Sequence, residues 1–226
     1  MRYTVALLDI DGTIVDSNDA HAHAWVKALS QHGHRVEFHA VRKLIGMGGD
    51  KLLKQLAGVD SESVEGRRIS AARRSIFSAE FLPTLLPTRG ARRMIEWLRQ
   101  EDVVIVIATS ALADEVNGLL KAAGVDDLID RVASSDDAEE SKPDPDIVVA
   151  ALQKSRRARD CAIMIGDTPY DIESATAAGI PTIAFRTGGW ADDDLAEAMA
   201  IFNDPEDLVV NREASPFMHG NKQRNA

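Results

Sequence analysis

Two aspartates, Asp9 and Asp11, stand two positions apart at the end of an apolar run and are followed by Gly12 and Thr13. The run predicts a buried strand that delivers both carboxylates to one edge of a sheet, on the same face if the strand stays regular. Neighbouring carboxylates repel each other unless a cation or a shared proton lies between them. Mg²⁺ suits that place, because it uses one or two protein carboxylates and leaves room for phosphate oxygens. Since an aspartate can also attack phosphorus, the segment indicates metal-assisted phosphoryl transfer.

Further polar side chains follow the later apolar runs of the chain, as they would at the carboxyl ends of strands. One such run covers residues 103–108 and another covers 162–165. In open α/β sheets, ligands bind outside the carboxyl ends of the strands. We therefore expect two hydroxyls, a lysine and four carboxylates to meet at one rim. Besides Asp9 and Asp11, the residues are Thr109, Ser110, Lys142, Asp167 and Asp171.

Strands and helices alternate from residue 88 to residue 185, which predicts a parallel sheet covered on both faces. The expected strands cover 103–108, 131–133, 162–165 and 181–185, and the expected helices cover 88–100, 113–124, 144–154 and 171–178. Residues 17–82 contain only helical patterns, the longest at 61–82. The prediction is an α/β fold, a doubly wound parallel sheet with a Rossmann-like core that is interrupted by an all-helical insertion.

These patterns divide the chain into three parts. Residues 1–16 and 84–210 form the predicted α/β catalytic core, and residues 17–83 form the predicted helical cap. Residues 211–226 are polar and show no periodicity, which predicts a mobile tail.

The composition limits the partners of the chain. Of its 226 residues, 45% are hydrophobic, an ordinary globular proportion, and the formal net charge is −10. This acidic balance argues against nucleic acid and against an anionic membrane as partners. No run is long enough to span a bilayer and none has the pattern of a secretory signal, so we expect a cytoplasmic protein. The sequence does not indicate an oligomeric state.

The run Asp9-Ile10-Asp11-Gly12-Thr13-Ile14-Val15-Asp16-Ser17 resembles the first sequence signature of the haloacid dehalogenase superfamily. Thr109 resembles the second signature, Lys142 the third, and Gly166-Asp167-Thr168-Pro169-Tyr170-Asp171 the fourth, in the same order. Together they resemble the branch of phosphoglycolate phosphatase and β-phosphoglucomutase, whose members carry a helical cap. The resemblance covers about residues 3–190, and the insertion matches only in type.

This resemblance implies a role for each residue at the rim. Asp9 attacks phosphorus and becomes an aspartyl-phosphate, while Asp11 acts as an acid for the leaving oxygen and then as a base for water. Mg²⁺ is held by Asp9, by Asp11 through its backbone carbonyl and by Asp167, and Asp171 supports the metal site. Phosphoryl transfer needs mostly positioning and charge neutralisation, which a metal and a lysine supply. The residues expected to bind the phosphate oxygens are Thr109, Ser110 and Lys142.

The leading prediction is a Mg²⁺-dependent phosphatase that hydrolyses a small phosphorylated metabolite. A phosphomutase of the β-phosphoglucomutase type is the alternative, because both reactions use Asp9 and Asp11. A non-catalytic phosphate-binding protein is a third hypothesis. In the predicted cap, His21 is a candidate for contact with the substrate or with its acid–base network. Lys51 follows the glycine-rich turn 46–49 and is a candidate for recognising the leaving group.

Overall fold

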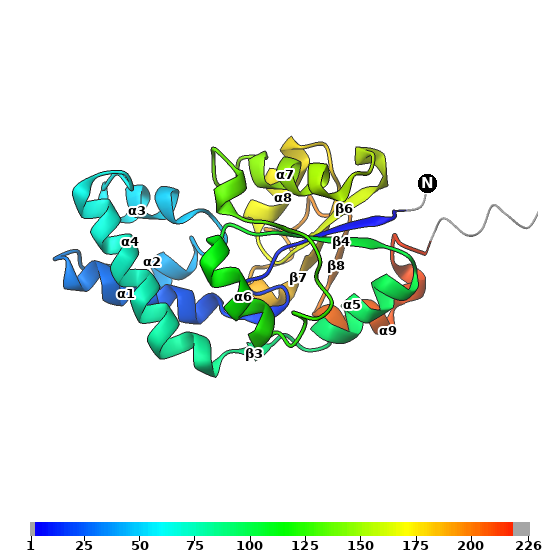
Figure 1. The fold of residues 1–226 in the computed structure, drawn as a ribbon, viewed down its shortest axis with the longest axis horizontal. Helices are drawn as coiled ribbons and strands as arrows, with labels where there is room; N and C mark the ends of the chain where they lie inside the picture. Colours follow the sequence, from blue (N-terminus) through cyan, green and yellow to red (C-terminus); the bar gives the residue numbers. More distant parts are fainter. Residues whose placement is uncertain (1–2, 219–226) are drawn as a thin grey trace, which may run out of the picture.

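The computed structural model describes residues 3–218 and is built around a six-stranded sheet (Figure 1). Neighbouring strands of this sheet are parallel throughout, in the order β5-β4-β1-β6-β7-β8. The strands are β1 (Val5–Leu8), β4 (Val104–Ala108), β5 (Val132–Ala133), β6 (Ala162–Gly166), β7 (Thr182–Phe185) and β8 (Ala200–Phe202). The predicted α/β fold with a doubly wound parallel sheet is therefore confirmed.

Apolar side chains bury both faces of this sheet. In β1, Val5 and Leu7 belong to one core cluster, whereas Ala6 and Leu8 belong to another, and all four are fully buried. Burial on both faces is why the strands are apolar without alternation. Helices α7 (Asp146–Ser155) and α8 (Pro169–Ala177) cover one face, and α5 (Ala91–Gln100), α6 (Ala113–Ala122) and α9 (Pro205–Val210) cover the other (Figure 1).

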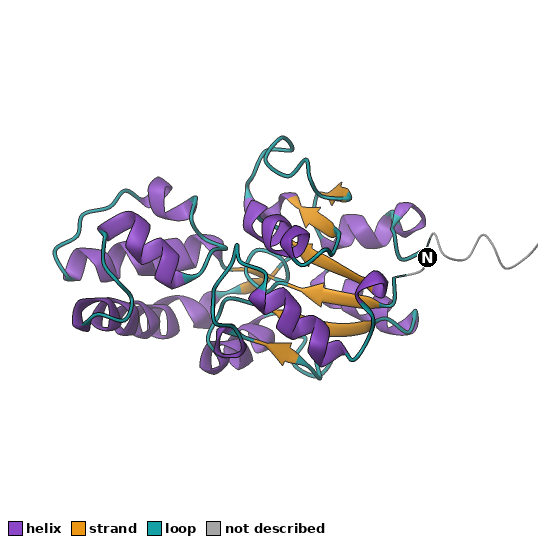
Figure 2. Cartoon of the chain, turned by 90° about the horizontal axis from the view of Figure 1, so that it is seen from above, coloured by secondary structure: helices purple, strands orange, loops and turns teal. Residues whose placement is uncertain are grey.

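The inserted helices lie together at one end of the sheet, beyond the carboxyl ends of its strands (Figures 1 and 2). They are α1 (Asn18–Gln31), α2 (Phe38–Arg42), α3 (Gly49–Ala57), α4 (Val64–Ile76) and the π-helical turn η1 (Phe77–Phe81). Helix α1 packs against α2 and α4 and buries Trp25 and Leu29 between them. The helix predicted at 61–82 is divided into α4 and the π-helical turn η1. No strand forms between Gly33 and Leu82, as the sequence predicts.

A two-stranded ribbon joins the two connections between the helical insertion and the sheet. Strand β2 (Val15–Asp16) pairs antiparallel with β3 (Leu86–Pro87), and Thr88 Oγ1 donates a hydrogen bond of 2.7 Å to the carbonyl of Thr13. The sequence analysis predicted no strand at either of these two segments. Because the chain leaves and re-enters the core at one paired point, the insertion is attached to the core as a unit.

The carboxyl-terminal part of the fold differs most from the expectation. Strand β8 and helix α9 were not predicted, because both are short. The mobile tail predicted from residue 211 is wrong as far as Phe217, whose ring is fully buried and meets Trp97 edge-on at 6.1 Å. The rest of that predicted tail, residues 219–226, lies outside the described residues.

Short turns complete the described chain. The 3₁₀ turns are η2 (Leu82–Thr84), η3 (Ser135–Asp137), η4 (Arg159–Cys161), η5 (Arg186–Gly188) and η6 (Arg212–Ala214). Between residues 3 and 218, none of the helices combines the length and the apolar character that a bilayer span requires.

Candidate active site

Three neighbouring strands end at one small cavity between the sheet and the inserted helices. Asp9 follows β1, Thr109 follows β4, and Asp167 follows β6. The cavity has a volume of about 60 Å³. Its lining comes from the core at Asp9, Asp11, Thr109, Ser110 and Ala111, and from the insertion at His21, Trp25, Ile45, Gly46 and Arg73. The strand ends therefore bring carboxylates and hydroxyls together where the sequence predicted a rim.

Lys142 lies at the centre of this rim and is fully buried. Its ammonium donates to Asp9 Oδ1 at 2.6 Å, to Asp171 Oδ1 at 2.7 Å and to the carbonyl oxygen of Ala108 at 2.9 Å. These three bonds use all the protons of the ammonium group. Burial alone would lower the pKa of Lys142, but the charges of Asp171 and Asp9 raise it, so the side chain stays a cation.

Asp9, Asp167 and Asp171 form a buried carboxylate group whose oxygens lie within 4.8 Å of one another. Burial raises the pKa of Asp9 well above its usual range against the opposing charge of Lys142. Burial and the neighbouring charge of Asp171 raise the pKa of Asp167 to about 8. One ammonium facing three carboxylates leaves negative charge uncompensated. A hard divalent cation fits this set, because every donor is an oxygen and the missing charge is positive.

The surroundings of Asp167 and Asp171 show different uses for the two carboxylates. Asp171 Oδ2 accepts from the hydroxyl of Thr168 at 2.7 Å and from its backbone N–H at 3.1 Å, in a capping box that begins α8. Asp167 accepts from Thr13 Oγ1 at 3.2 Å and from Asn18 Nδ2 at 2.8 Å. Asp171 is therefore committed to the helix cap and to Lys142, whereas Asp167 is held by two side chains that follow β1 in the sequence.

Gly12 allows Asp167 to approach the loop after β1. Its φ of +72° lies in the left-handed region, and a Cβ atom there would stand 1.9 Å from Asp167 Oδ2. The strand itself ends at Leu8, so the regular strand considered for Asp9 and Asp11 does not continue through them. The two aspartates consequently point to different partners.

Asp11 faces the inserted helices rather than the carboxylate group. Its Oδ1 accepts from Ser17 Oγ at 2.5 Å and from His21 Nε2 at 2.7 Å. Burial acts to raise its pKa, but His21, Ser17 and the charge of Arg73 together lower it to about 2. The side chain of Asp11 is not part of the carboxylate group, so the predicted metal contact of this residue is left to its backbone carbonyl.

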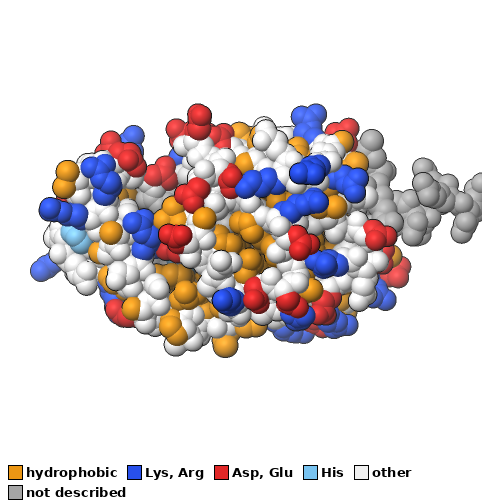
Figure 3. Space-filling view, in the orientation of Figure 1, with side chains coloured by type: hydrophobic (Ala, Val, Ile, Leu, Met, Phe, Trp, Pro, Cys, Tyr) orange, Lys and Arg blue, Asp and Glu red, His pale blue; other side chains and the backbone are white. Residues whose placement is uncertain are grey.

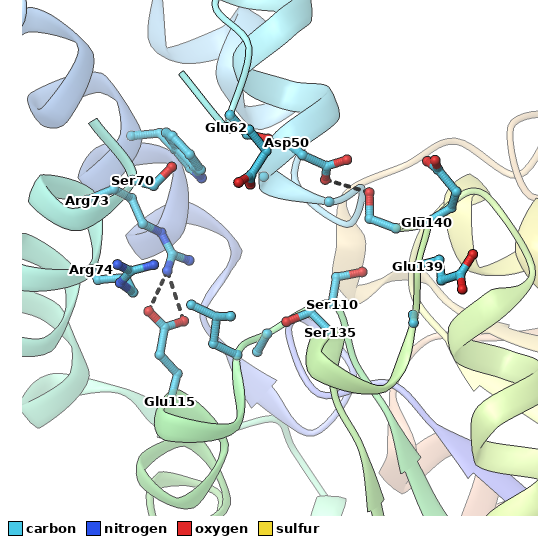
Figure 4. A pocket seen from close by; sticks show the side chains of 18 residues that line it. Asp50, Glu62, Ser70, Arg73, Arg74, Ser110, Glu115, Ser135, Glu139 and Glu140 are labelled. Atoms are coloured by element: carbon cyan, nitrogen blue, oxygen red, sulfur yellow. Dashed lines mark hydrogen bonds and ion pairs between the residues drawn. The ribbon is translucent and has the colours of Figure 1, made fainter. Parts of the chain in front are cut away.

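The tautomer of His21 follows from its two contacts. Arg73 Nη2 lies 2.6 Å from His21 Nδ1, and a guanidinium can only donate, so Nδ1 accepts. The proton of the ring is therefore on Nε2, from which it is donated to Asp11. Arg73 also donates to both carboxylate oxygens of Glu115, at 2.6 and 2.8 Å (Figure 4). A chain of contacts thus runs from Asp11 through α1 and α4 to α6 of the core.

The remaining predicted residues, Ser110, Thr109 and Lys51, differ in their contacts. Ser110 Oγ is buried beside the cavity and has no hydrogen-bond partner among the described residues. Thr109 Oγ1 accepts from the backbone N–H of Ala111 at 3.0 Å. Lys51 lines neither this cavity nor the larger one beside it, and its ammonium instead binds the carbonyl of Ser141 at 2.6 Å and the carboxylate of Asp144. The geometry gives no support to contact between Lys51 and a substrate.

Some residues of the site were not found from the sequence. Ser17 ends the first signature and Asn18 follows it, and their polarity at the start of a helix was the available signal for a role in the site. Arg73 and Glu115 carry no local signal, because exposed charged residues on helices are common. They meet only when α4 is folded back toward α6.

The family model of the haloacid dehalogenase-like hydrolases matches residues 6–185, which is most of the chain. The chain belongs to this family. It is 27% identical over 203 residues to the validoxylamine A 7′-phosphate phosphatase of Streptomyces hygroscopicus subsp. limoneus, covering 89% of this chain and 94% of that protein. It is also 27% identical over 208 residues to the phosphoglycolate phosphatase of Rhodospirillum rubrum, covering 88% and 86%.

A solved structure of a hydrolase from Pseudomonas syringae superposes on this chain with a TM-score of 0.86 at 28% sequence identity. The match covers 93% of this chain and 98% of that one. The family resemblance read from the four sequence signatures is thereby confirmed, together with the fold that it implied.

Proposed function

We propose that this protein is a Mg²⁺-dependent phosphatase that hydrolyses a small phosphorylated metabolite through an aspartyl-phosphate on Asp9. The observation that carries the proposal is the position of Asp9. Its carboxylate lies in the small cavity, is held by Lys142 at 2.6 Å and is grouped with Asp167. Asp11 also lines this cavity and is held by His21 at 2.7 Å.

A metal ion fits the buried carboxylate group. We expect Asp9, Asp167 and the backbone carbonyl of Asp11 to hold it, with Asp171 fixing Lys142 beside them. When bound, Mg²⁺ neutralises charge on the phosphate and on Asp9, so that an anion can approach an anion. The hydroxyls of Thr109 and Ser110 would hold phosphate oxygens, which accounts for the unpartnered hydroxyl of Ser110. Lys142 supplies positive charge beside the phosphate, and it would bind a phosphate oxygen by exchanging one of its three present hydrogen bonds.

Each bond change and each proton transfer of the reaction can then be assigned to a residue. An oxygen of Asp9 bonds to phosphorus while the bond from phosphorus to the ester oxygen breaks. The leaving oxygen takes a proton from Asp11, behind which His21 Nε2 holds another. Water then attacks phosphorus, gives its proton to Asp11, and releases inorganic phosphate and free Asp9. In the free fold the pKa of Asp11 is about 2, which suits its role as the base of this second step. As the acid of the first step Asp11 must carry a proton, and the negative charge of the bound phosphate favours this by raising the pKa of the carboxyl group.

The comparisons support the type of reaction, but they do not point to one substrate. The two named phosphatases are equally similar to this chain, at 27% identity, yet their names give different substrates. A second cavity of about 540 Å³ adjoins the small one, a size within the range of sites for small molecules. We therefore propose a small-molecule substrate, and the larger cavity must hold its leaving group.

The test is release of inorganic phosphate from a panel of phosphate monoesters, with Mg²⁺ and with a chelator. We expect Mg²⁺-dependent turnover of at least one compound and none by an Asp9→Asn variant. Binding of phosphate esters without turnover would favour the non-catalytic alternative. Formation of an isomeric phosphate that requires a bisphosphate activator, without net release of phosphate, would favour the phosphomutase. Either result would overturn the proposal.

A further inference from the structure

The larger cavity is where a leaving group must lie, because it adjoins the small cavity over Asp9. The two cavities share Trp25, Arg73, Ser110 and Ala111 in their walls. Figure 4 shows the larger one between the inserted helices and the loops of the core, with charged side chains on both sides. A phosphate ester bound at Asp9 therefore places its alcohol among these side chains.

The walls of this cavity are acidic. Its carboxylates are Asp50, Glu62, Glu115, Glu139 and Glu140, and its cations are Arg73 and Arg74. Arg73 Nη1 donates to both carboxylate oxygens of Glu115, so the two charges neutralise each other. Arg74 is then the one remaining cation of the lining, against the other four carboxylates. Acidic side chains also gather where the helical insertion meets the sheet in the face shown in Figure 3.

Cations outside the lining do not reverse this balance. Lys51 Nζ lies 3.9 Å from Glu140 but is bound more closely by Asp144, which brings a further negative charge. Arg67 lies 3.8 Å from Glu62 at the surface, where both side chains are largely exposed and water screens their attraction. The lining therefore carries a net negative charge, in which the carboxylates of Glu62, Glu139 and Glu140 are exposed to water.

Buried polar groups in the same walls lack partners. The hydroxyl oxygens of Ser110 and Ser135 and the Nε of Arg73 are buried with no hydrogen-bond partner among residues 3–218. Buried polar groups are normally paired, so groups that line a cavity without a partner indicate a polar ligand. Three further serines, Ser61, Ser70 and Ser141, line the cavity and add hydroxyls to it.

We infer, resting on the phosphatase function proposed above, that the preferred substrate is a phosphate ester of a hydroxylated, amine-bearing alcohol such as an amino sugar. Hydroxyls of the leaving group would pair with Ser135 and the other serines of the wall, and an ammonium would be attracted to the acidic wall. A carboxylate or a second phosphate on the leaving group would instead be repelled by four carboxylates in a partly enclosed site. We therefore expect phosphate esters with an anionic leaving group, such as phosphoglycolate, to be poor substrates.

A hexose series that varies the charge of the leaving group tests this inference. Glucosamine 6-phosphate, glucose 6-phosphate and 6-phosphogluconate carry a cationic, a neutral and an anionic leaving group. At low salt we expect kcat/KM to fall in that order, by at least about tenfold from first to last, with the difference reduced at high salt. The inhibition constants of the three compounds against p-nitrophenyl phosphate turnover should rise in the same order. This second measurement covers the case in which the hexose phosphates bind but turn over slowly.

A matched pair of variants assigns the preference to the acidic wall. Glu62→Gln combined with Glu139→Gln should reduce the preference for glucosamine 6-phosphate over 6-phosphogluconate at least about threefold. Glu213→Gln removes one carboxylate near α9, at the opposite end of the molecule from the inserted helices, and should leave both this preference and p-nitrophenyl phosphate turnover unchanged (Figure 1).

The outcomes separate this inference from the proposed function. Turnover of p-nitrophenyl phosphate that depends on Asp9, with an equal or reversed order in both kcat/KM and inhibition constants, overturns the inference and leaves the phosphatase intact. An unchanged preference in the double variant also overturns it. Absence of Asp9-dependent turnover of every phosphate ester overturns both.

Discussion

The rim of the sheet and the wall of the larger cavity are built in different ways. At the rim, Lys142, Asp167 and Asp171 are almost fully buried, and each has short contacts to neighbours that come from the strand ends. In the wall, Glu62 and Glu139 are exposed and come from segments far apart in the sequence. The rim handles the phosphoryl group, which every substrate shares, whereas the wall meets the leaving group, which differs. Rigid positioning of side chains is therefore needed only at the rim.

Arg73 connects the two regions. Its guanidinium binds His21 behind Asp11 on one side and Glu115 in the cavity wall on the other, and it lies 5.1 Å from the ring centre of Phe77. A change in the wall can therefore reach the acid–base residue through one side chain. The following predictions test the separation of the two regions and the strength of this link.

The largest loss is expected at the rim, from Asp9→Asn. The amide keeps the size of the carboxylate but is a poor nucleophile and a poor metal ligand, so kcat should fall by at least about 10⁴-fold for every substrate. The measurement is phosphate release from p-nitrophenyl phosphate and from the best metabolite, with circular dichroism as the control for folding. Near-normal turnover by a folded variant would remove Asp9 from the mechanism.

Asp11→Asn should cost less, because it removes acid–base help while the nucleophile remains. The expected loss in kcat is about 10²–10⁴-fold. The loss should be smaller for p-nitrophenyl phosphate, whose leaving group needs no proton, as long as the attack of Asp9 limits the rate. A loss below about threefold for a metabolite with a poor leaving group would limit Asp11 to its backbone contact with the metal.

Glu115→Gln tests the link between the regions with a smaller effect. The variant keeps the shape of Glu115 but weakens its ion pair with Arg73, which is largely buried on both sides. A charged hydrogen bond contributes about 1.5–3 kcal/mol, so we expect kcat/KM to fall about tenfold. Asp127→Asn breaks an exposed ion pair with Arg92 on the core and serves as the matched control. Equal activity of the two variants would show that the Arg73 link does not act on catalysis.

Asp167→Asn tests the rim without an activity assay. In the metal-free fold the pKa of Asp167 is raised to about 8, whereas an unfolded aspartate titrates near 3.9. The unfolded chain releases this proton first, so the carboxylate lowers stability increasingly as the pH rises from about 4 to about 8. Without metal, the variant should therefore gain Tm over the wild type by more at pH 8 than at pH 5.

Saturating Mg²⁺ provides the control for that comparison. It should raise the Tm of the wild type at pH 8 more than that of Asp167→Asn, because the amide is the weaker ligand. If the Tm difference between the two proteins does not change with pH or with Mg²⁺, Asp167 is not part of a charged metal site.

The rim was predictable from the sequence and the cavity wall was not. The Asp9 segment and Asp167 follow apolar runs, so strand ends place them by a local rule. Lys142 was identified from its place before a proline-led helix start and from its resemblance to the third signature. Arg73 is one of two adjacent arginines on a polar helix and has the sequence of a solvated face. Its partner Glu115 is 42 residues away, and only the tertiary fold joins them.

Short elements were missed for a related reason. Strand β8 has three residues and helix α9 has six, which is too few for a periodic pattern to stand out. Phe217 is a single aromatic residue in a polar stretch, and its burial depends on Trp97, more than a hundred residues earlier. Such contacts are decided by tertiary packing, which a window along the sequence does not contain.

The most direct test of the central claim, covalent phosphoryl transfer to Asp9, uses Asp11→Asn, in which hydrolysis of the intermediate should be slow. The variant is mixed with p-nitrophenyl phosphate and Mg²⁺, quenched rapidly in acid, and mapped by peptide mass spectrometry. We predict a phosphoryl group on Asp9 that is absent when Asp9→Asn is added. Release of p-nitrophenol at a measurable rate with no phosphoryl group on Asp9, or with the group on another residue, would contradict the account.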